Sequence, residues 1–196
     1  MKTTLIIIFA TLFLLVIVIQ LMSFKSTSNT ESYKYKVEKK FDGIEIREYE
    51  NAMFIKTKLN NDVYENISGN GFKTLAGYIF GGNSENKKIP MTSPVIVDMG
   101  VNREMNFMVP SNFQKEQLPT PNSSFIEFIQ KEKHRSAAIT FGGWANESKI
   151  QNYIEKLNET LEKKNIEHKG NFAFYGYNPP YEVLNRKNEV IVELID

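Results

Sequence analysis

The sequence predicts an α+β protein: a pseudo-twofold, distorted antiparallel β-barrel or sheet flanked by two helices and preceded by one N-terminal transmembrane helix. Three observations support this prediction. A run of mostly apolar residues opens the chain, the order strand, helix, strand, strand occurs twice after it, and each later helix is apolar on one face. The repeated order predicts two related halves that share one core.

The composition is that of an ordinary globular protein. The chain has 196 residues, 41% of them apolar, and a formal charge of +1, so no nucleic-acid partner is expected. It has no cysteine, which excludes disulfides, thiolate nucleophiles and Cys-ligated metals. With His134 and His168 as its two histidines, a multi-histidine metal site within one chain is not expected.

The first element is the apolar run over residues 5–24. Twenty residues at about 1.5 Å each span roughly 30 Å, the thickness of a bilayer core. A cleaved signal peptide is the rival, but its apolar part is usually shorter and the cleavage site here is poor. We predict a single-pass anchor over residues 1–24, a polar linker over 25–32 and a folded domain over 33–196. Flanking lysines leave the orientation open, and we expect the domain outside the cytoplasm.

The first half of the domain begins with alternating residues over 44–49, which continue over 52–55 as a bent strand or a strand pair. Asp62 and Glu65 form a capping-box pattern that predicts a helix from about Val63. Glycines 81 and 82 should end this helix, since glycine readily adopts the left-handed conformation of a helix C-terminus.

An extended segment over residues 89–99 follows the helix. Pro90 and Pro94 each lack a backbone N–H, so this strand should lie at a sheet edge or carry a bulge. Residues 94–99 and 105–109 are predicted as strands joined by a turn.

The second half repeats the order. Residues 124–129 and 137–144 are predicted strands, and Ser148 with Gln151 forms a capping box for a second helix. Residues 172–177 and 189–195 are the closing strands.

Several fragments, in this order and spacing, resemble the SOUL, or haem-binding protein, family. They are Glu45-Ile-Arg-Glu-Tyr49, the helix over 72–81, Lys88-Ile-Pro-Met-Thr-Ser-Pro-Val95, Phe107-Met-Val-Pro110, Leu118-Pro-Thr-Pro121, Phe141-Gly-Gly143, Gly176-Tyr-Asn-Pro-Pro180 and Arg186-Lys-Asn-Glu-Val190. The resemblance covers residues 41–195 and leaves out the anchor. It implies a distorted barrel built from two repeated halves, and non-covalent binding of haem or another tetrapyrrole in a shallow apolar cleft along the first helix of the domain.

The resemblance also implies which residues form the cleft. Its apolar lining would be Phe72, Leu75, Ala76, Ile79 and Phe80 of the helix, with Met91 and Val95 from the following strand. Lys73, Lys87, Lys88 and Arg186 are the cations available for the tetrapyrrole carboxylates.

The iron ligand is where this sequence departs from the family. Some members carry a histidine just before the tyrosine of the first strand motif, and Glu48 occupies that place here. A carboxylate is a poor axial ligand beside His, Cys, Met or Tyr. Tyr78 and Met91 are the substitutes that the sequence offers near the cleft.

Glu48 also permits an alternative function. In related bacterial effector-binding domains a buried carboxylate pairs with cationic hydrophobic molecules, and a simple alternation would turn Glu48 inward with Ile44 and Ile46. The competing interpretation is that Glu48 pairs with a surface lysine.

Two further alternatives stay open: a tethered interaction domain without a small ligand, and a hydrolase, for which no motif is present. We expect no enzyme activity. The prediction is a membrane-anchored tetrapyrrole-binding protein that sequesters, buffers or delivers its hydrophobic ligand.

Overall fold

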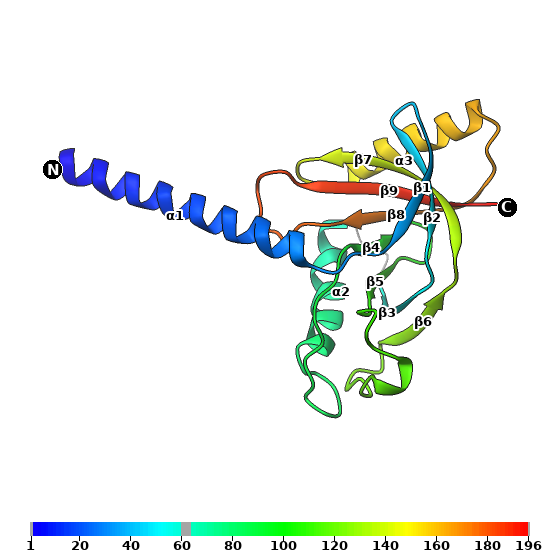
Figure 1. Ribbon diagram of the computed structural model, residues 1–196, viewed down its shortest axis with the longest axis horizontal. Helices are drawn as coiled ribbons and strands as arrows, with labels where there is room; N and C mark the ends of the chain where they lie inside the picture. The colour runs from blue at the N-terminus through cyan, green and yellow to red at the C-terminus, as the bar shows by residue number, and fades with distance from the viewer. Residues whose placement is uncertain (1, 60–63, 196) are drawn as a thin grey trace.

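The computed structural model describes residues 2–59 and 64–195 (Figure 1). Within these residues, three α-helices and a 3-10 helix accompany one nine-stranded antiparallel sheet, which confirms the α+β class. The elements in chain order are α1 (Lys2–Asn29), β1 (Tyr35–Phe41), β2 (Ile44–Tyr49), β3 (Ala52–Lys58), α2 (Tyr64–Ile79), β4 (Val95–Asp98), β5 (Glu104–Met108), η1 (Lys115–Gln117), β6 (Glu127–Lys131), β7 (His134–Gly142), α3 (Glu147–Lys163), β8 (His168–Gly176) and β9 (Lys187–Leu194).

The sheet has the strand order β1-β2-β7-β9-β8-β4-β5-β3-β6 and curls into a half-barrel. Its centre is the antiparallel pair β4–β8. Outward from this pair, β5 and β3 on one side match β9 and β7 on the other, and the chain order β3-α2-β4-β5 matches β7-α3-β8-β9. The repeated order of elements in the sequence therefore corresponds to a repeated order in space.

A long bent strand joins the two halves. Strands β2 and β3 follow each other after a short break but pair with different partners, as Tyr49 opposite His134 and Ala52 opposite Lys131 show. The predicted bend near residue 50 is therefore present, and the two segments do not form a hairpin with each other.

Both faces of the sheet are buried. On one face, Leu75 and Ile79 of α2 and Ile150 and Leu157 of α3 pack into a single apolar core. The opposite face carries a second buried cluster, which is rich in aromatic residues and includes Tyr33, Tyr49, Phe54 and Tyr175. Side chains on both sides of each central strand are therefore shielded from water.

Two local predictions are wrong. Strand β4 lies inside the sheet between β5 and β8, not at an edge, because Pro90 and Pro94 precede its first residue and remove no hydrogen bond from the ladder. Helix α3 is capped by Asn146, whose side chain accepts a hydrogen bond from the Lys149 N–H at 2.8 Å, and not by Ser148. The predicted cap of α2 at Asp62 lies outside the described residues.

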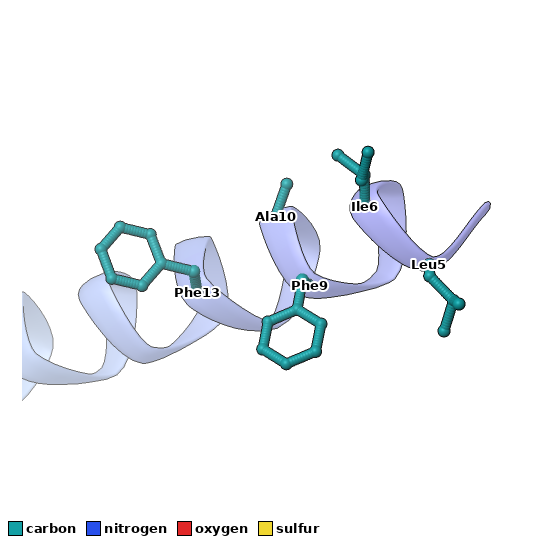
Figure 2. A pocket seen from close by; sticks show the side chains of 5 residues that line it. All are labelled: Leu5, Ile6, Phe9, Ala10 and Phe13. Atoms are coloured by element: carbon teal, nitrogen blue, oxygen red, sulfur yellow. The ribbon is translucent and has the colours of Figure 1, made fainter. Parts of the chain in front are cut away.

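Helix α1 projects from the domain as a separate rod (Figure 1). It continues through residues 25–29, which were expected in a polar linker. Large apolar side chains along it are exposed. Figure 2 shows a shallow apolar hollow on α1 alone, which is lined by four of them, Leu5, Ile6, Phe9 and Phe13, and by the smaller Ala10. The predicted membrane span gains no support, since in the described part of the chain no helix combines the length and apolar character needed to cross a bilayer.

Candidate functional site

The C-terminal end of helix α2 is fixed by its glycines. Gly81 has a φ of +112°, and the Gly82 N–H donates to the Gly77 carbonyl at 2.8 Å. A Cβ at Gly82 would lie 2.7 Å from that carbonyl oxygen, so the turn requires glycine there. The Ile89 N–H then donates to the Ile79 carbonyl at 2.8 Å, which brings the following segment back against the end of the helix.

The central apolar residues of α2 belong to the core. Leu75 is fully buried and Ile79 nearly so, and both lie in the main cluster under the sheet. Met91 and Val95 are partly buried against the same cluster. In this conformation these residues support the helix from below and do not offer an open surface to a ligand.

The flank of α2 that borders the solvent carries the other predicted residues, although Ala76 among them is only 6% exposed and belongs to the main core cluster. We call this flank the α2 shelf and define it as Phe72, Lys73, Ala76, Gly77 and Phe80. Phe72, Ala76 and Phe80 form one i, i+4, i+8 row, and Lys73 and Gly77 form the adjacent row. Phe72 is 41% exposed and Phe80 is 63% exposed, whereas Ala76 has a single side-chain carbon and Gly77 has none.

The space above the middle of the shelf is open. A Cβ built on Gly77 would meet nothing within 4 Å. Phe72 is held at one end by an edge contact with the buried ring of Phe107, with ring centroids 5.3 Å apart. Eight residues at about 1.5 Å each separate Phe80 from Phe72 by roughly 12 Å along the helix. The shelf is thus a low apolar surface between two rings.

The predicted cations fall into two groups. Lys73 on the shelf and Lys88 beside the end of the helix are both exposed. Lys87 donates to the Gln117 carbonyl and lies over the Phe113 ring. Arg186 is engaged in another part of the fold, where it donates to backbone carbonyls and stacks on Trp144. Lys73 therefore lies on the shelf and Lys88 lies next to the residue that bonds the end of α2, whereas Arg186 is engaged elsewhere.

Of the two candidate iron ligands, Met91 is partly buried against the main core cluster and Tyr78 is engaged in a structural hydrogen bond. The Tyr78 hydroxyl donates to the Pro119 carbonyl at 2.9 Å, and burial raises the pKa of Tyr78 to about 12, so it stays protonated. His134 and His168 begin strands β7 and β8, and His134 stacks on Tyr49 with centroids 5.5 Å apart. The described residues hold no group of three or more His, Asp or Glu side chains suited to a metal ion.

Glu48 pairs with a surface lysine. Its carboxylate lies 2.8 Å from the Lys133 amine and is about one-third exposed. The inward orientation that the alternative function requires is therefore wrong. Two carboxylates are buried among the described residues, Glu182 and Glu189, and Glu189 on β9 has no exposed surface.

Glu189 is already paired within the protein. Arg47 donates to both of its oxygens at 2.8 Å, the Tyr177 hydroxyl donates at 2.6 Å and the Lys187 amine lies 3.1 Å away. Burial alone would raise the pKa of Glu189, but the hydrogen bonds and charge of Arg47 lower it to about 2. Sequence reasoning missed this pair, because the alternation of β2 assigns Arg47 to the face opposite the isoleucines.

A small hollow lies on another part of the surface. It measures about 280 Å³ and is lined by polar and apolar groups that include Tyr33, Glu50, Met53, Phe113 and Lys115. None of the residues predicted for the cleft lines it.

Comparisons with known proteins agree with the order of the sequence motifs. The family model for the SOUL heme-binding protein matches residues 30–193. Heme-binding protein 1 of Xenopus laevis is 30% identical over 159 residues, which cover 76% of this chain and 83% of that protein. Heme-binding protein 2 of Homo sapiens is 30% identical over 156 residues, which cover 74% of this chain and 75% of that protein.

Solved structures share the fold at low sequence identity. The C-terminal domain of EcmrR superposes with a TM-score of 0.59 at 9% identity, covering 83% of this chain and 98% of that domain. A hydrolase from Listeria innocua superposes with a TM-score of 0.53 at 8% identity, covering 87% of this chain and 96% of that protein. Identities this low establish a common architecture and leave the activity to be argued from the site.

Proposed function

The chain belongs to the SOUL haem-binding protein family, and on that premise we propose that it binds haem or another tetrapyrrole non-covalently on the α2 shelf. Family membership supports a haem or tetrapyrrole ligand. The place of binding is our inference from the geometry of α2. The main supporting observation is that two exposed aromatic rings, Phe72 and Phe80, lie in one row on the helix with the small residue Ala76 between them.

The shelf matches the shape of a tetrapyrrole, which is a flat apolar ring system with carboxylates at its rim. Small residues at positions 76 and 77 allow the macrocycle to approach the helix closely. Phe72 and Phe80 then contact it from either end, and each such aromatic contact contributes about 0.5–1.5 kcal/mol beyond area burial. Lys73 and Lys88 are placed to meet carboxylates at the solvent side, where each ion pair contributes up to about 1 kcal/mol.

Recognition of the ring, rather than of the iron, follows from the residues around the shelf. Tyr78 is buried and its hydroxyl is bonded to Pro119, and Met91 packs partly buried against the core, so neither is offered to the ligand. Metal-free protoporphyrin should therefore bind about as well as ferric haem. Such a site suits sequestration, buffering or delivery of the ligand, and none of these roles requires catalysis.

An absorbance titration of the full chain in a mild detergent tests this proposal. Ferric haem and protoporphyrin are each added to a fixed concentration of protein, and the Soret band is followed to saturation. Saturable binding of both with similar Kd values supports the proposal. Binding of haem alone would point to an axial ligand and contradict ring recognition, and binding of neither would reject the function.

The alternative centred on Glu48 is not adopted. Glu48 already has Lys133 as its cationic partner, and the buried carboxylate Glu189 already has Arg47 and Lys187. A cationic ligand would have to displace these internal partners before it could pair with either carboxylate.

We also propose that α1 tethers the domain to a membrane, with the domain outside the cytoplasm. The support is the apolar run over residues 5–24 and the exposure of large side chains such as Phe9 and Phe13, each more than two-thirds exposed. Apolar surface in water costs about 25 cal/mol per Å², and lipid would relieve that cost. Flotation of the full chain with lipid vesicles, resistant to high salt, tests the tether; protein left in the soluble fraction would reject it.

A further inference from the structure

The connection between β8 and β9, residues 177–186, turns its apolar side chains outward. We call it the β8–β9 loop. Tyr181, Val183 and Leu184 are 59%, 56% and 64% exposed. Glu182, between them, is only 2% exposed, and its carboxylate accepts a hydrogen bond from the Thr27 hydroxyl at 2.7 Å. The loop therefore exposes apolar side chains to the outside, while the carboxylate of Glu182 points inward.

This loop lies against helix α1 (Figure 1). The Gln20 side chain donates to the Tyr181 carbonyl at 2.9 Å and accepts from the Val183 N–H at 3.0 Å. Gln20 lies within the apolar run of α1, where an unpaired amide in lipid would be costly. The two hydrogen bonds satisfy that amide and two backbone groups of the loop together.

The same edge of the domain includes the sole tryptophan of the chain. Trp144 is about half exposed, and the Arg186 guanidinium stacks on its ring at 4.1 Å. Arg186 also donates to the carbonyls of Pro179 and Glu182, at 2.8 and 2.6 Å. One arginine thus connects the tryptophan to the β8–β9 loop and satisfies backbone carbonyls of the loop.

The charges bordering this edge are mainly positive. Lys149 donates to the Gly142 and Trp144 carbonyls, and Lys187, which begins β9 directly after the loop, is partly exposed although its amine also lies 3.1 Å from Glu189. The nearby carboxylates add little exposed negative charge, because Glu182 is buried and Glu147 is paired with Arg103 at 2.7 Å. Cations beside exposed aromatic and aliphatic groups are typical of surfaces that meet phospholipid headgroups.

We propose that the β8–β9 loop and Trp144 form a lipid-contacting edge that seats the domain on the bilayer beside α1. The proposal rests on the proposed membrane tether. Gln20 lies four residues before the end of the apolar run, so at about 1.5 Å per residue the bonded loop reaches roughly 6 Å below that end. This depth corresponds to the boundary between headgroups and acyl chains, where amphipathic elements lie.

The fluorescence of Trp144 reports the contact directly. The full chain is reconstituted into vesicles of phosphatidylcholine and phosphatidylglycerol whose acyl chains carry bromine either near the headgroup or near the chain end. We expect a blue-shifted emission that bromine near the headgroup quenches more strongly than bromine at the chain end. The double variant Val183→Asp/Leu184→Asp should lose this quenching while it still floats with the vesicles.

A matched control separates the edge from a general effect of added charge. Val101→Asp/Phe125→Asp changes two apolar side chains outside this edge that are still more exposed, at 86% and 75%, and should leave the quenching unchanged. Circular dichroism of each variant checks that it is folded. If the unmodified protein floats with the vesicles but bromine does not quench Trp144, the proposed lipid-contacting edge is wrong and the proposed tether stands. If the unmodified protein does not float, both proposals are rejected.

Discussion

Replacing Arg47 with Met tests whether the buried pair with Glu189 stabilises the fold. Arg47 is 2% exposed and bonds both oxygens of a carboxylate that has no exposure. Met fills a similar volume without charge, so the variant leaves Glu189 buried with Lys187 as its remaining cation. Removing one partner of a buried pair typically costs about 3–5 kcal/mol, because the other charge is left uncompensated.

The pKa of Glu189 shows the same direction. Its lowering from 4.5 to about 2 corresponds to roughly 3 kcal/mol, at about 1.4 kcal/mol per pH unit. This net shift also includes burial, Lys187 and Tyr177, so the expected loss rests on the cost of breaking a buried pair: Arg47→Met should lower the free energy of unfolding by about 3 kcal/mol or more at pH 7. In the variant the pKa of Glu189 should rise, and acid should then affect stability at a higher pH.

Urea unfolding followed by circular dichroism, on the full chain in a non-ionic detergent, measures this loss. Lys163→Met is the matched control, because its partner Glu159 is an exposed i, i+4 neighbour and such pairs contribute well under 1 kcal/mol. Adding Glu189→Gln to Arg47→Met should recover part of the loss by removing the unpaired charge. A loss below about 1 kcal/mol for Arg47→Met would refute the reasoning.

Three further predictions follow from single features of the fold. Because the folded pKa of Glu189 is depressed to about 2, its stabilisation should be complete above about pH 4.5 and be lost as the pH falls toward 2; urea midpoints that do not change across this range would contradict it. Phe80→Ala should raise the Kd for ferric haem by roughly 2- to 10-fold, measured by the Soret titration, and an unchanged Kd would place the ligand elsewhere. Asn146→Ala should lower the free energy of unfolding by about 1 kcal/mol, and an unchanged value would show that the α3 cap contributes nothing.

Alternation and helical spacing predicted the regular elements well. Strands β2, β3, β5 and β9 were found within a residue or two at most ends, because apolar residues with period two mark them clearly. Strand β1 was not predicted, since four of its seven residues are charged and read as polar. Such residues are common on edge strands, where they hinder pairing with another chain.

The buried ion pair could not be predicted from one strand. An alternating pattern is usually interpreted as a strand with one buried and one solvated face. On that interpretation, Arg47 and Glu189 would lie in water. Here the second buried cluster, which is rich in aromatic residues, covers that face of the sheet, so the polar residues on that face are buried as well. The continuous apolar run after Glu189, Val190-Ile-Val192, was the available signal of burial on both faces.

The candidate site was predicted in part. Helical spacing identified the correct helix, but it could not separate the residues that face the core from those at its flank. Leu75 and Ile79 lie in the core, and Phe72 and Phe80 remain exposed. Gly77 was missed because a helical glycine is usually read only as a weak position.

The Kd of Gly77→Glu for ferric haem tests the α2 shelf most directly. Glutamate favours the helix by several tenths of a kcal/mol over glycine, and its Cβ meets nothing within 4 Å, so the variant should fold at least as stably. Its side chain would fill the shelf and repel the ligand carboxylates. Asn152→Glu, an exposed position on α3, is the control for charge. We predict that Gly77→Glu abolishes saturable binding and that Asn152→Glu does not; unchanged binding by Gly77→Glu would contradict the site.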